Sequence, residues 1–140
     1  MKPSPARVMA FDWGLRNIGI AVGNSALGTS EPLTIVRARD GAADFDAIGK
    51  LIAEWQPGQL LVGEPLNMDG SDADITPRAR KFARQLEGRF NLPVSLVDER
   101  LSSQEAKANQ KERGHHGHWG SDPIDAEAAD IILRTWLSEQ

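Results

Sequence analysis

Hydrophobic residues in this chain recur at two different periods, and the change between them near position 45 constrains the fold most. Before that position, residues 7–13 place alternate side chains on opposite faces, as a strand does. A tight turn over residues 14–17 leads into a second strand over residues 18–22, and a third strand is expected over residues 33–38. After it, residues 45–55 carry apolar side chains at helical spacing. The chain is therefore expected to begin with a strand meander and to continue with helices.

The rest of the chain alternates between short strands and amphipathic helices. Residues 60–62 form a wholly apolar run typical of a buried central strand, and residues 94–97 predict a further strand. Helices are expected over residues 76–90, after Ser102 and over residues 122–137. This order predicts an α/β fold with a five-stranded mixed sheet, in which a three-strand antiparallel meander precedes parallel βα units.

Length and composition limit the class of protein. At 140 residues with 40% hydrophobic residues, the chain is expected to form one domain over residues 1–140. The absence of cysteine excludes disulfide scaffolds and thiolate zinc sites. No apolar segment is long enough for a signal peptide or a membrane span, so we expect a soluble, cytoplasmic protein without a membrane partner.

Charge is distributed unevenly along the chain. The net charge of −4 gives no whole-molecule reason to expect nucleic-acid binding. Residues 78–113, however, carry nine Lys or Arg against five Asp or Glu. This stretch predicts a local basic surface suited to a phosphodiester substrate, although a solvated helix face explains the same pattern.

Acidic residues stand where the ends of the predicted strands and helices can converge. Asp12 ends the first strand, Asp98 and Glu99 end the last strand, and Asp125 lies in the first turn of the final helix. Each position also has a purely structural explanation, such as a turn for Asp12 or the helix dipole for Asp125. If they meet at one sheet edge, the carboxylates repel one another unless cations lie between them. Oxygen ligands suit Mg²⁺ or Mn²⁺, and two such ions about 4 Å apart support phosphodiester hydrolysis.

The metal-binding interpretation leaves open which of Asp98 and Glu99 is the ligand. Because alternate strand residues point to opposite faces, only one of Asp98 and Glu99 can share a face with Asp12. A single bulge at the strand end would exchange the two faces, so the sequence does not decide between them. A second metal site in the histidine-rich segment over residues 114–119, with His115, His116 and His118, is disfavoured, and a substrate-contacting or variable surface loop fits that composition better.

Five segments stand in a characteristic order and spacing: FDWGLRNIGIAVG, VGEPLNMDGS, RARKFARQLEGRF, VDERLSSQEA and DAEAADIIL. Together they resemble the YqgF (RuvX) family of Holliday junction resolvase-like proteins, which are linked to maturation of the 5′ end of pre-16S ribosomal RNA. The resemblance implies a ribonuclease H-like fold, with helices flanking a five-stranded mixed sheet. It also implies an acidic site formed by Asp12, by Asp98 and Glu99 with Arg100 beside them, and by Asp125.

Two positions depart from the pattern of that family. Residues 15–17 read Leu-Arg-Asn in place of a more basic stretch, which leaves Arg16 as the basic residue there. Glu64 stands where the family has leucine. Related resolvases carry a catalytic glutamate near the end of the corresponding strand, so Glu64 is a candidate metal ligand. A surface-loop glutamate explains this position equally well.

The sequence thus predicts a Mg²⁺- or Mn²⁺-dependent phosphodiesterase that acts on structured RNA such as pre-16S rRNA, free or in ribosomal particles. Asp12, Asp98 or Glu99, and Asp125 would hold the metal, and an activated water would attack the phosphorus. The candidate contacts to the phosphate backbone are Arg16, Arg78, Arg80, Lys81, Arg84 and Arg100.

Three other functions stay open at this stage. The same chemistry on branched DNA would make the chain a junction resolvase, for which a homodimer rather than a monomer is expected. A non-catalytic ribosome-assembly factor would use the domain only to bind RNA. A nucleotide binder of the sugar-kinase type fits poorly, because that architecture needs two lobes and 140 residues supply one.

Overall fold

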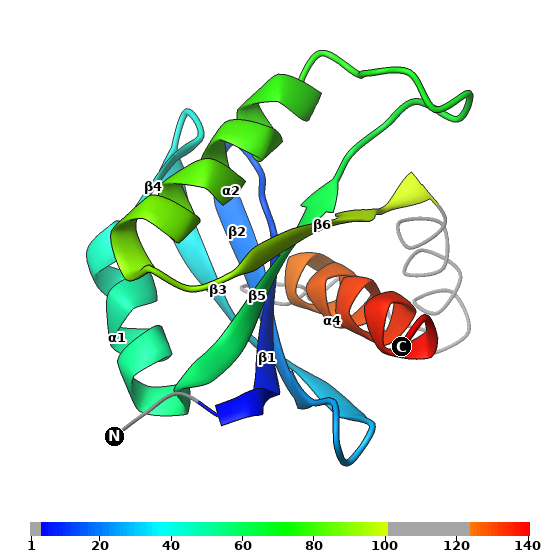
Figure 1. The fold of residues 1–140 in the computed structure, drawn as a ribbon. Helices are drawn as coiled ribbons and strands as arrows, with labels where there is room; N and C mark the ends of the chain where they lie inside the picture. The colour runs from blue at the N-terminus through cyan, green and yellow to red at the C-terminus, as the bar shows by residue number, and fades with distance from the viewer. Residues whose placement is uncertain (1–3, 101–123) are drawn as a thin grey trace, which may run out of the picture.

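The computed structural model describes residues 4–100 and 124–140, which form a mixed sheet with helices on both faces (Figure 1). The strands are β1 (Ser4–Asp12), β2 (Asn17–Asn24), β3 (Thr29–Arg39), β4 (Ala42–Ala43), β5 (Pro57–Glu64) and β6 (Val94–Asp98). Their order across the sheet is β4-β3-β2-β1-β5-β6. The predicted α/β class with a mixed sheet is confirmed.

The described sheet has six strands, one more than the five predicted. The additional strand, β4, contains two residues and pairs with the end of β3, where Arg39 lies opposite Ala42. The two residues between these partners, Asp40 and Gly41, have positive φ angles of 48° and 84°. An Asp-Gly pair with positive φ at both residues forms a tight hairpin turn. That dipeptide is the sequence signal that the prediction of five strands overlooked.

The strand directions bring three carboxyl ends to one edge of the sheet. β1 runs antiparallel to β2, with Asp12 opposite Gly19, and β2 runs antiparallel to β3. β1 runs parallel to β5, and β5 runs parallel to β6, with Glu64 beside Asp98. The predicted meander followed by parallel strands is therefore confirmed. Because β1, β5 and β6 are parallel, the residues that end them lie along the same edge.

The helices described are α1 (Phe45–Trp55), α2 (Thr76–Phe90) and α4 (Ile124–Ser138). α1 begins where the Asp44 side chain accepts a hydrogen bond from the Ala47 amide at 3.1 Å, a typical N-cap. It ends at Gln56, whose φ of 50° turns the chain into β5. α2 has Pro77 in its first turn, where a missing N–H leaves no helical hydrogen bond unmade. In Figure 1, α1 and α2 cover one face of the sheet and α4 covers the other.

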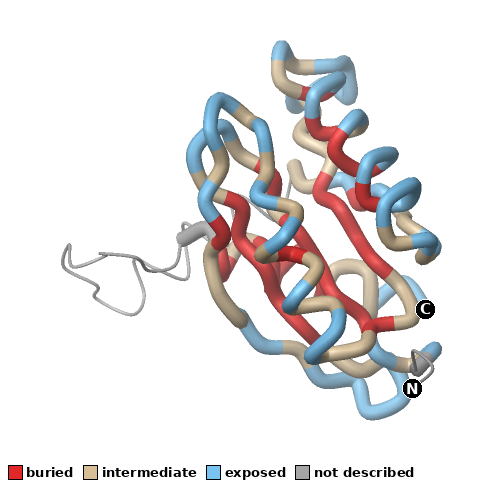
Figure 2. The backbone as a smooth tube through the Cα atoms, turned by 90° about the vertical axis from the view of Figure 1, so that its left-hand side faces the viewer, coloured by how far each residue is buried: buried red, intermediate tan, exposed pale blue. Residues whose placement is uncertain are grey.

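Alternate residues of β1 pack into these two layers. Met9 and Phe11 belong to the hydrophobic cluster under α1 and α2, whereas Val8 and Ala10 belong to the cluster under α4. Figure 2 shows the central strands as the buried part of the molecule, between exposed helix and loop surfaces. By the same alternation, Asp12 lies on the face of the sheet that α4 covers, here called the α4 face.

Some sequence predictions fall outside the described residues. These are the helix after Ser102, the histidine-rich segment over residues 114–119 and the start of the last helix at Asp122. Among the helices that the structure describes, none combines the length and apolar character needed to cross a bilayer.

Candidate active site

Asp12 ends β1 on the α4 face and is half-buried there. Its neighbours across the sheet on that face are glycines. Gly19 lies opposite it in β2, and the register of β1 with β5 places Gly63 beside it. Glycine in a central strand weakens the strand and often marks a place where another group approaches the backbone closely. Here the two glycines place no side chain of their own beside the Asp12 carboxyl group.

Glu99 follows β6 directly and turns its side chain onto the α4 face. Its amide donates a hydrogen bond to the Glu64 carbonyl at 3.3 Å, which continues the pairing of β6 with β5. A Cβ atom built on Gly63 would lie 2.5 Å from Glu99 Oε2 and 2.6 Å from Ile132 Cδ1. The Glu99 carboxyl group therefore occupies the space that any side chain at position 63 would fill.

The side chains of Glu99 and Asp12 interact through a hydrogen bond. Burial raises the pKa of Glu99 above its ordinary value; the hydrogen bond to Asp12 acts against this rise, and the charge of Asp98 adds to it. A buried pair of this kind is the arrangement that a cation between two carboxylates would relieve. In the part of the chain that the structure describes, no group of three potential metal ligands gathers.

Asp125 lies in the first turn of α4, and its side chain is outside what the structure describes. Its predicted meeting with Asp12 stays a prediction.

Asp98 points to the other face of the sheet, and its carboxylate is bound by Arg100. The Arg100 guanidinium donates to both oxygens, with Nη2 at 2.6 Å from Oδ2 and Nε at 3.1 Å from Oδ1. This hydrogen bonding lowers the pKa of Asp98 and keeps it ionised. Arg100 Nη1 also donates to the Met68 carbonyl at 3.1 Å, which ties the β5–α2 loop to the end of β6. The structure brings Glu99, and not Asp98, to Asp12.

Glu64 also lies away from Asp12, on the face covered by α1 and α2. Its Oε2 accepts a hydrogen bond at 2.7 Å from Arg80 Nε of α2. The same guanidinium donates to both oxygens of Asp72, at 2.8 and 2.9 Å. These bonds raise the pKa of Arg80. Arg80 thus joins the end of β5 to the loop that follows it, and the structure does not bring Glu64 to the Asp12–Glu99 pair.

The other predicted phosphate contacts have different surroundings. The Arg78 guanidinium lies over the Trp13 ring, 5.5 Å from its centroid, and 3.7 Å from the Asp40 carboxylate. Lys81 and Arg84 are exposed on α2, on the far side of the sheet from Asp12. Arg16 is exposed in the turn after β1, and lines a shallow depression together with Asp12, Asn17 and Ile75.

Sequence reasoning missed the part played by Gly63. The available signal was a glycine in the apolar run of a predicted central strand, immediately before Glu64. It also missed the loop contacts of Arg80 and Arg100, which depend on loop geometry and leave no periodic signal in the sequence.

The fold is that of the Holliday junction resolvases. The chain superposes on Thermus thermophilus RuvC in complex with a Holliday junction substrate with a TM-score of 0.53 at 15% identity, over 95% of both chains. It superposes on a Fowlpox virus resolvase in complex with Holliday junction DNA with a TM-score of 0.52 at 10% identity, over 95% of this chain and 97% of that one. Similarity at this level of identity concerns the fold alone.

Sequence comparison gives the family. The pattern of the family described as "RuvX: Holliday junction resolvase" matches residues 6–139. A protein of Yersinia pestis (strain Pestoides F), named "Putative pre-16S rRNA nuclease", is 47% identical over 133 residues, which is 95% of each chain. A protein of the same name from Yersinia pseudotuberculosis serotype IB (strain PB1/+) is 46% identical over the same length. The chain belongs to the RuvX family.

Proposed function

We propose that this chain is a metal-dependent nuclease that processes the 5′ end of pre-16S ribosomal RNA during ribosome biogenesis. The observation that carries the proposal is the Asp12–Glu99 carboxyl pair at the carboxyl edge of the sheet, in the space left by Gly63. The substrate class is taken from the name of relatives that are 47% identical over 95% of both chains. The substrate would be structured RNA, free or in ribosomal particles.

The residues at this edge suit Mg²⁺ or Mn²⁺. All the donors are carboxylate oxygens, which are the ligands that these ions prefer. The contact between Asp12 and Glu99 supports this, because two neighbouring carboxylates are both ionised most readily when a cation lies between them. Asp12 and Glu99 would hold the ion, and Asp125 from α4 is the proposed third ligand. Such ions, when bound, activate water and stabilise the leaving oxygen of a phosphodiester.

The other residues of the edge have supporting roles in this proposal. Gly63 lets the Glu99 carboxyl group reach the level of Asp12. Asp98 and Glu64 do not act as ligands but hold Arg100 and Arg80, which fix the β5–α2 loop beside the site. Arg16, which lines the same depression as Asp12, would contact a phosphate of the substrate.

A junction resolvase acting on branched DNA is the second candidate. The family description and the resolvase fold favour it. Cutting a four-way junction symmetrically would require two copies of the chain related by a two-fold axis. The metal site would be the same, so substrate choice and oligomeric state separate the two candidates.

The test is Mn²⁺-dependent cleavage of a pre-16S leader RNA and of a synthetic four-way DNA junction. The wild type is compared with Asp12→Asn, Glu99→Gln and the matched control Asp98→Asn, with folding checked by circular dichroism. Asp12→Asn and Glu99→Gln should each lose at least about 100-fold in rate, since even a 1 Å displacement of a catalytic group has that effect. Asp98→Asn should retain most of its activity.

The outcomes separate the candidate functions. Preferred cleavage of the RNA supports the proposal, and preferred cleavage of the junction supports the resolvase. Equal activity in wild type and Asp12→Asn would place the chemistry elsewhere. Binding of the leader RNA without any cleavage would support a non-catalytic assembly factor.

A further inference from the structure

We propose that Arg37 and Arg39 of β3 bind the phosphate backbone of the nucleic acid strand that enters the Asp12–Glu99 site. The inference rests on the proposed function, because it assumes a nucleic acid substrate. It adds a binding surface that lies outside the basic stretch of residues 78–113. This surface, consisting of Arg37 and Arg39, is called here the β3 arginine pair.

The β3 arginine pair lies on the α4 face, as Asp12 does. Val36 and Ala38 pack into the opposite cluster, under α1 and α2. Because side chains alternate along a strand, Arg37 and Arg39 point to the α4 face. Both are exposed, so α4 does not cover them.

The strand register places the pair close to the candidate site. Asp12 lies opposite Gly19 of β2, which lies opposite Ile35 of β3, and Arg37 is two residues further along. Arg37 is two strands away from Asp12 and two residues further along the strand direction. Its backbone therefore lies about 10 Å from that of Asp12 across the sheet and about 7 Å from it along the strands. With one phosphate per 3.4 Å of each duplex strand, this corresponds to about three or four nucleotides.

The backbone that carries the pair is fixed to the turn after Asp12. The Ala38 amide donates a hydrogen bond to the Arg16 carbonyl at 2.8 Å, and the Gly41 amide donates to the Leu15 carbonyl at 2.8 Å. Trp13 Nε1 donates to the Gly41 carbonyl at 3.1 Å. The two arginines therefore extend from a rigid strand end whose position relative to Asp12 is set by main-chain bonds.

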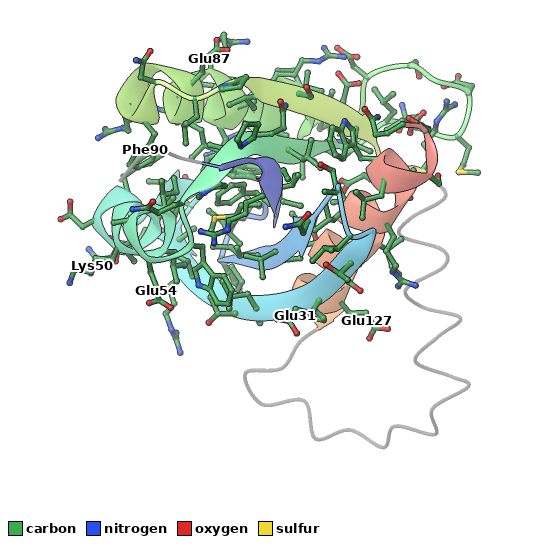
Figure 3. The ribbon with its side chains drawn as sticks, turned by 60° about the horizontal axis from the view of Figure 1, so that its bottom comes forward. Glu31, Lys50, Glu54, Glu87, Phe90 and Glu127 are labelled. Atoms are coloured by element: carbon green, nitrogen blue, oxygen red, sulfur yellow. The ribbon has the colours of Figure 1, made fainter. Side chains whose placement is uncertain are left out.

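The pair is also available to a ligand. In the described ranges, neither guanidinium forms an ion pair or a side-chain hydrogen bond, whereas those of Arg78, Arg80 and Arg100 are bound to carboxylates of the same chain. Guanidinium groups recognise phosphates through paired hydrogen bonds, so two arginines that have no partner among the described residues suit a phosphodiester backbone. Lys81 and Arg84 are exposed too, but they lie on α2, which covers the face of the sheet opposite to α4. Figure 3 labels Glu87 and Phe90 of α2 and Glu127 of α4, and the two α2 residues lie well apart from Glu127.

The test compares two variants that remove the same charge from opposite faces. The Arg37→Gln/Arg39→Gln variant removes the β3 arginine pair, and Lys81→Gln/Arg84→Gln removes two exposed cations from α2. Affinity for a labelled single-stranded RNA and for a four-way DNA junction is measured in EDTA over a range of salt concentrations. Each lost phosphate contact should lower the slope of log affinity against log salt by about 0.7 for the single strand, so about 1.4 is expected for the β3 variant.

Cleavage kinetics supply the second measurement. The β3 variant should raise KM while kcat stays close to that of the wild type, because the arginines bind substrate remotely from the reacting phosphate. The α2 variant should resemble the wild type in both measurements. Urea unfolding of both variants checks that neither change acts through stability.

The results distinguish failure of this inference from failure of the proposed function. An unchanged salt slope in the β3 variant, or a reduced slope in the α2 variant alone, overturns the assignment of the β3 arginine pair while the proposed function stands. Absence of salt-dependent binding of either nucleic acid by the wild type overturns both. A reduced slope on RNA alone, or on the junction alone, supports the assignment and identifies which nucleic acid crosses β3.

Discussion

Replacing Gly63 with alanine should damage the candidate site. The new Cβ would lie 2.5 Å from Glu99 Oε2 and 2.6 Å from Ile132 Cδ1, whereas ordinary contacts begin at 3.4 Å. Gly63 pairs with β6 through Val97 and is flanked by β1 on its other side, so its backbone cannot retreat. The Glu99 carboxyl group must therefore move by about 0.9 Å, and Ile132 by about 0.8 Å, to restore normal contact.

Both stability and activity should respond to this displacement. Overpacking a close-packed site costs about 1–3 kcal/mol of unfolding free energy. A catalytic group displaced by about 1 Å can cost about 100-fold in rate, so cleavage should fall by that order. Urea unfolding measures the first effect, and Mn²⁺-dependent cleavage of the leader RNA measures the second. Gly88→Ala is the matched control, because its Cβ would meet nothing within 4 Å in α2.

The same Gly63→Ala substitution in a Glu99→Ala chain tests whether the clash with Glu99 causes these losses. In a Glu99→Ala chain the carboxyl group is gone, so the added methyl group should cost less stability than it does in the wild type. Equal costs in the two backgrounds would show that Glu99 does not occupy the space beside Gly63. Wild-type stability and activity in Gly63→Ala itself would also refute the role given to this glycine.

Two further predictions concern the charges around the site. Burial raises the pKa of Glu99 in the folded chain, so the folded chain keeps a proton that the unfolded chain loses above about pH 4.5. Without metal, the unfolding free energy should therefore fall as the pH rises above about 4.5. Glu99→Gln should remove this decline, as measured by urea unfolding at a series of pH values. The pKa of Asp98 is lowered in the folded chain, so Asp98 stabilises the fold above about pH 3.8 and this contribution is lost as the pH falls further. Asp98→Asn should remove that contribution. Arg80→Gln and Asp72→Asn should each destabilise the β5–α2 loop, and the double variant should cost less than the sum of the two, as measured by thermal unfolding. Additive costs would mean that the pair does not hold the loop.

The acidic edge was predictable because it follows from strand order. Asp12 ends an apolar strand, and the parallel order of the later strands was enough to bring Asp98 and Glu99 to the same edge. The choice between the last two was not predictable, since it depends on the register at a single strand end. The structure decides it through two local facts: Arg100 is placed to bind Asp98, and Gly63 leaves room for Glu99.

The basic surface was harder to predict, because a count of charges along the sequence takes no account of intramolecular pairing. Arg78, Arg80 and Arg100 contribute to the basic excess of residues 78–113, yet each is bound to a carboxylate of its own chain. Arg37 lies in a part of the sequence that is net acidic, but is exposed on the α4 face. Only the sheet register relates it to Asp12.

The internal pairing has a consequence for the electrostatics of the site. Four carboxyl groups, those of Asp12, Glu64, Asp98 and Glu99, lie along the ends of three adjacent strands, and their mutual repulsion would oppose folding of this edge. Arg80 and Arg100 neutralise two of them and leave the carboxyl groups of Asp12 and Glu99 together on one face. A cation that approaches the α4 face of this edge therefore meets the Asp12–Glu99 pair rather than four competing carboxylates. On this reasoning, Arg100, which binds Asp98, helps to concentrate the negative charge of the edge on the Asp12–Glu99 pair.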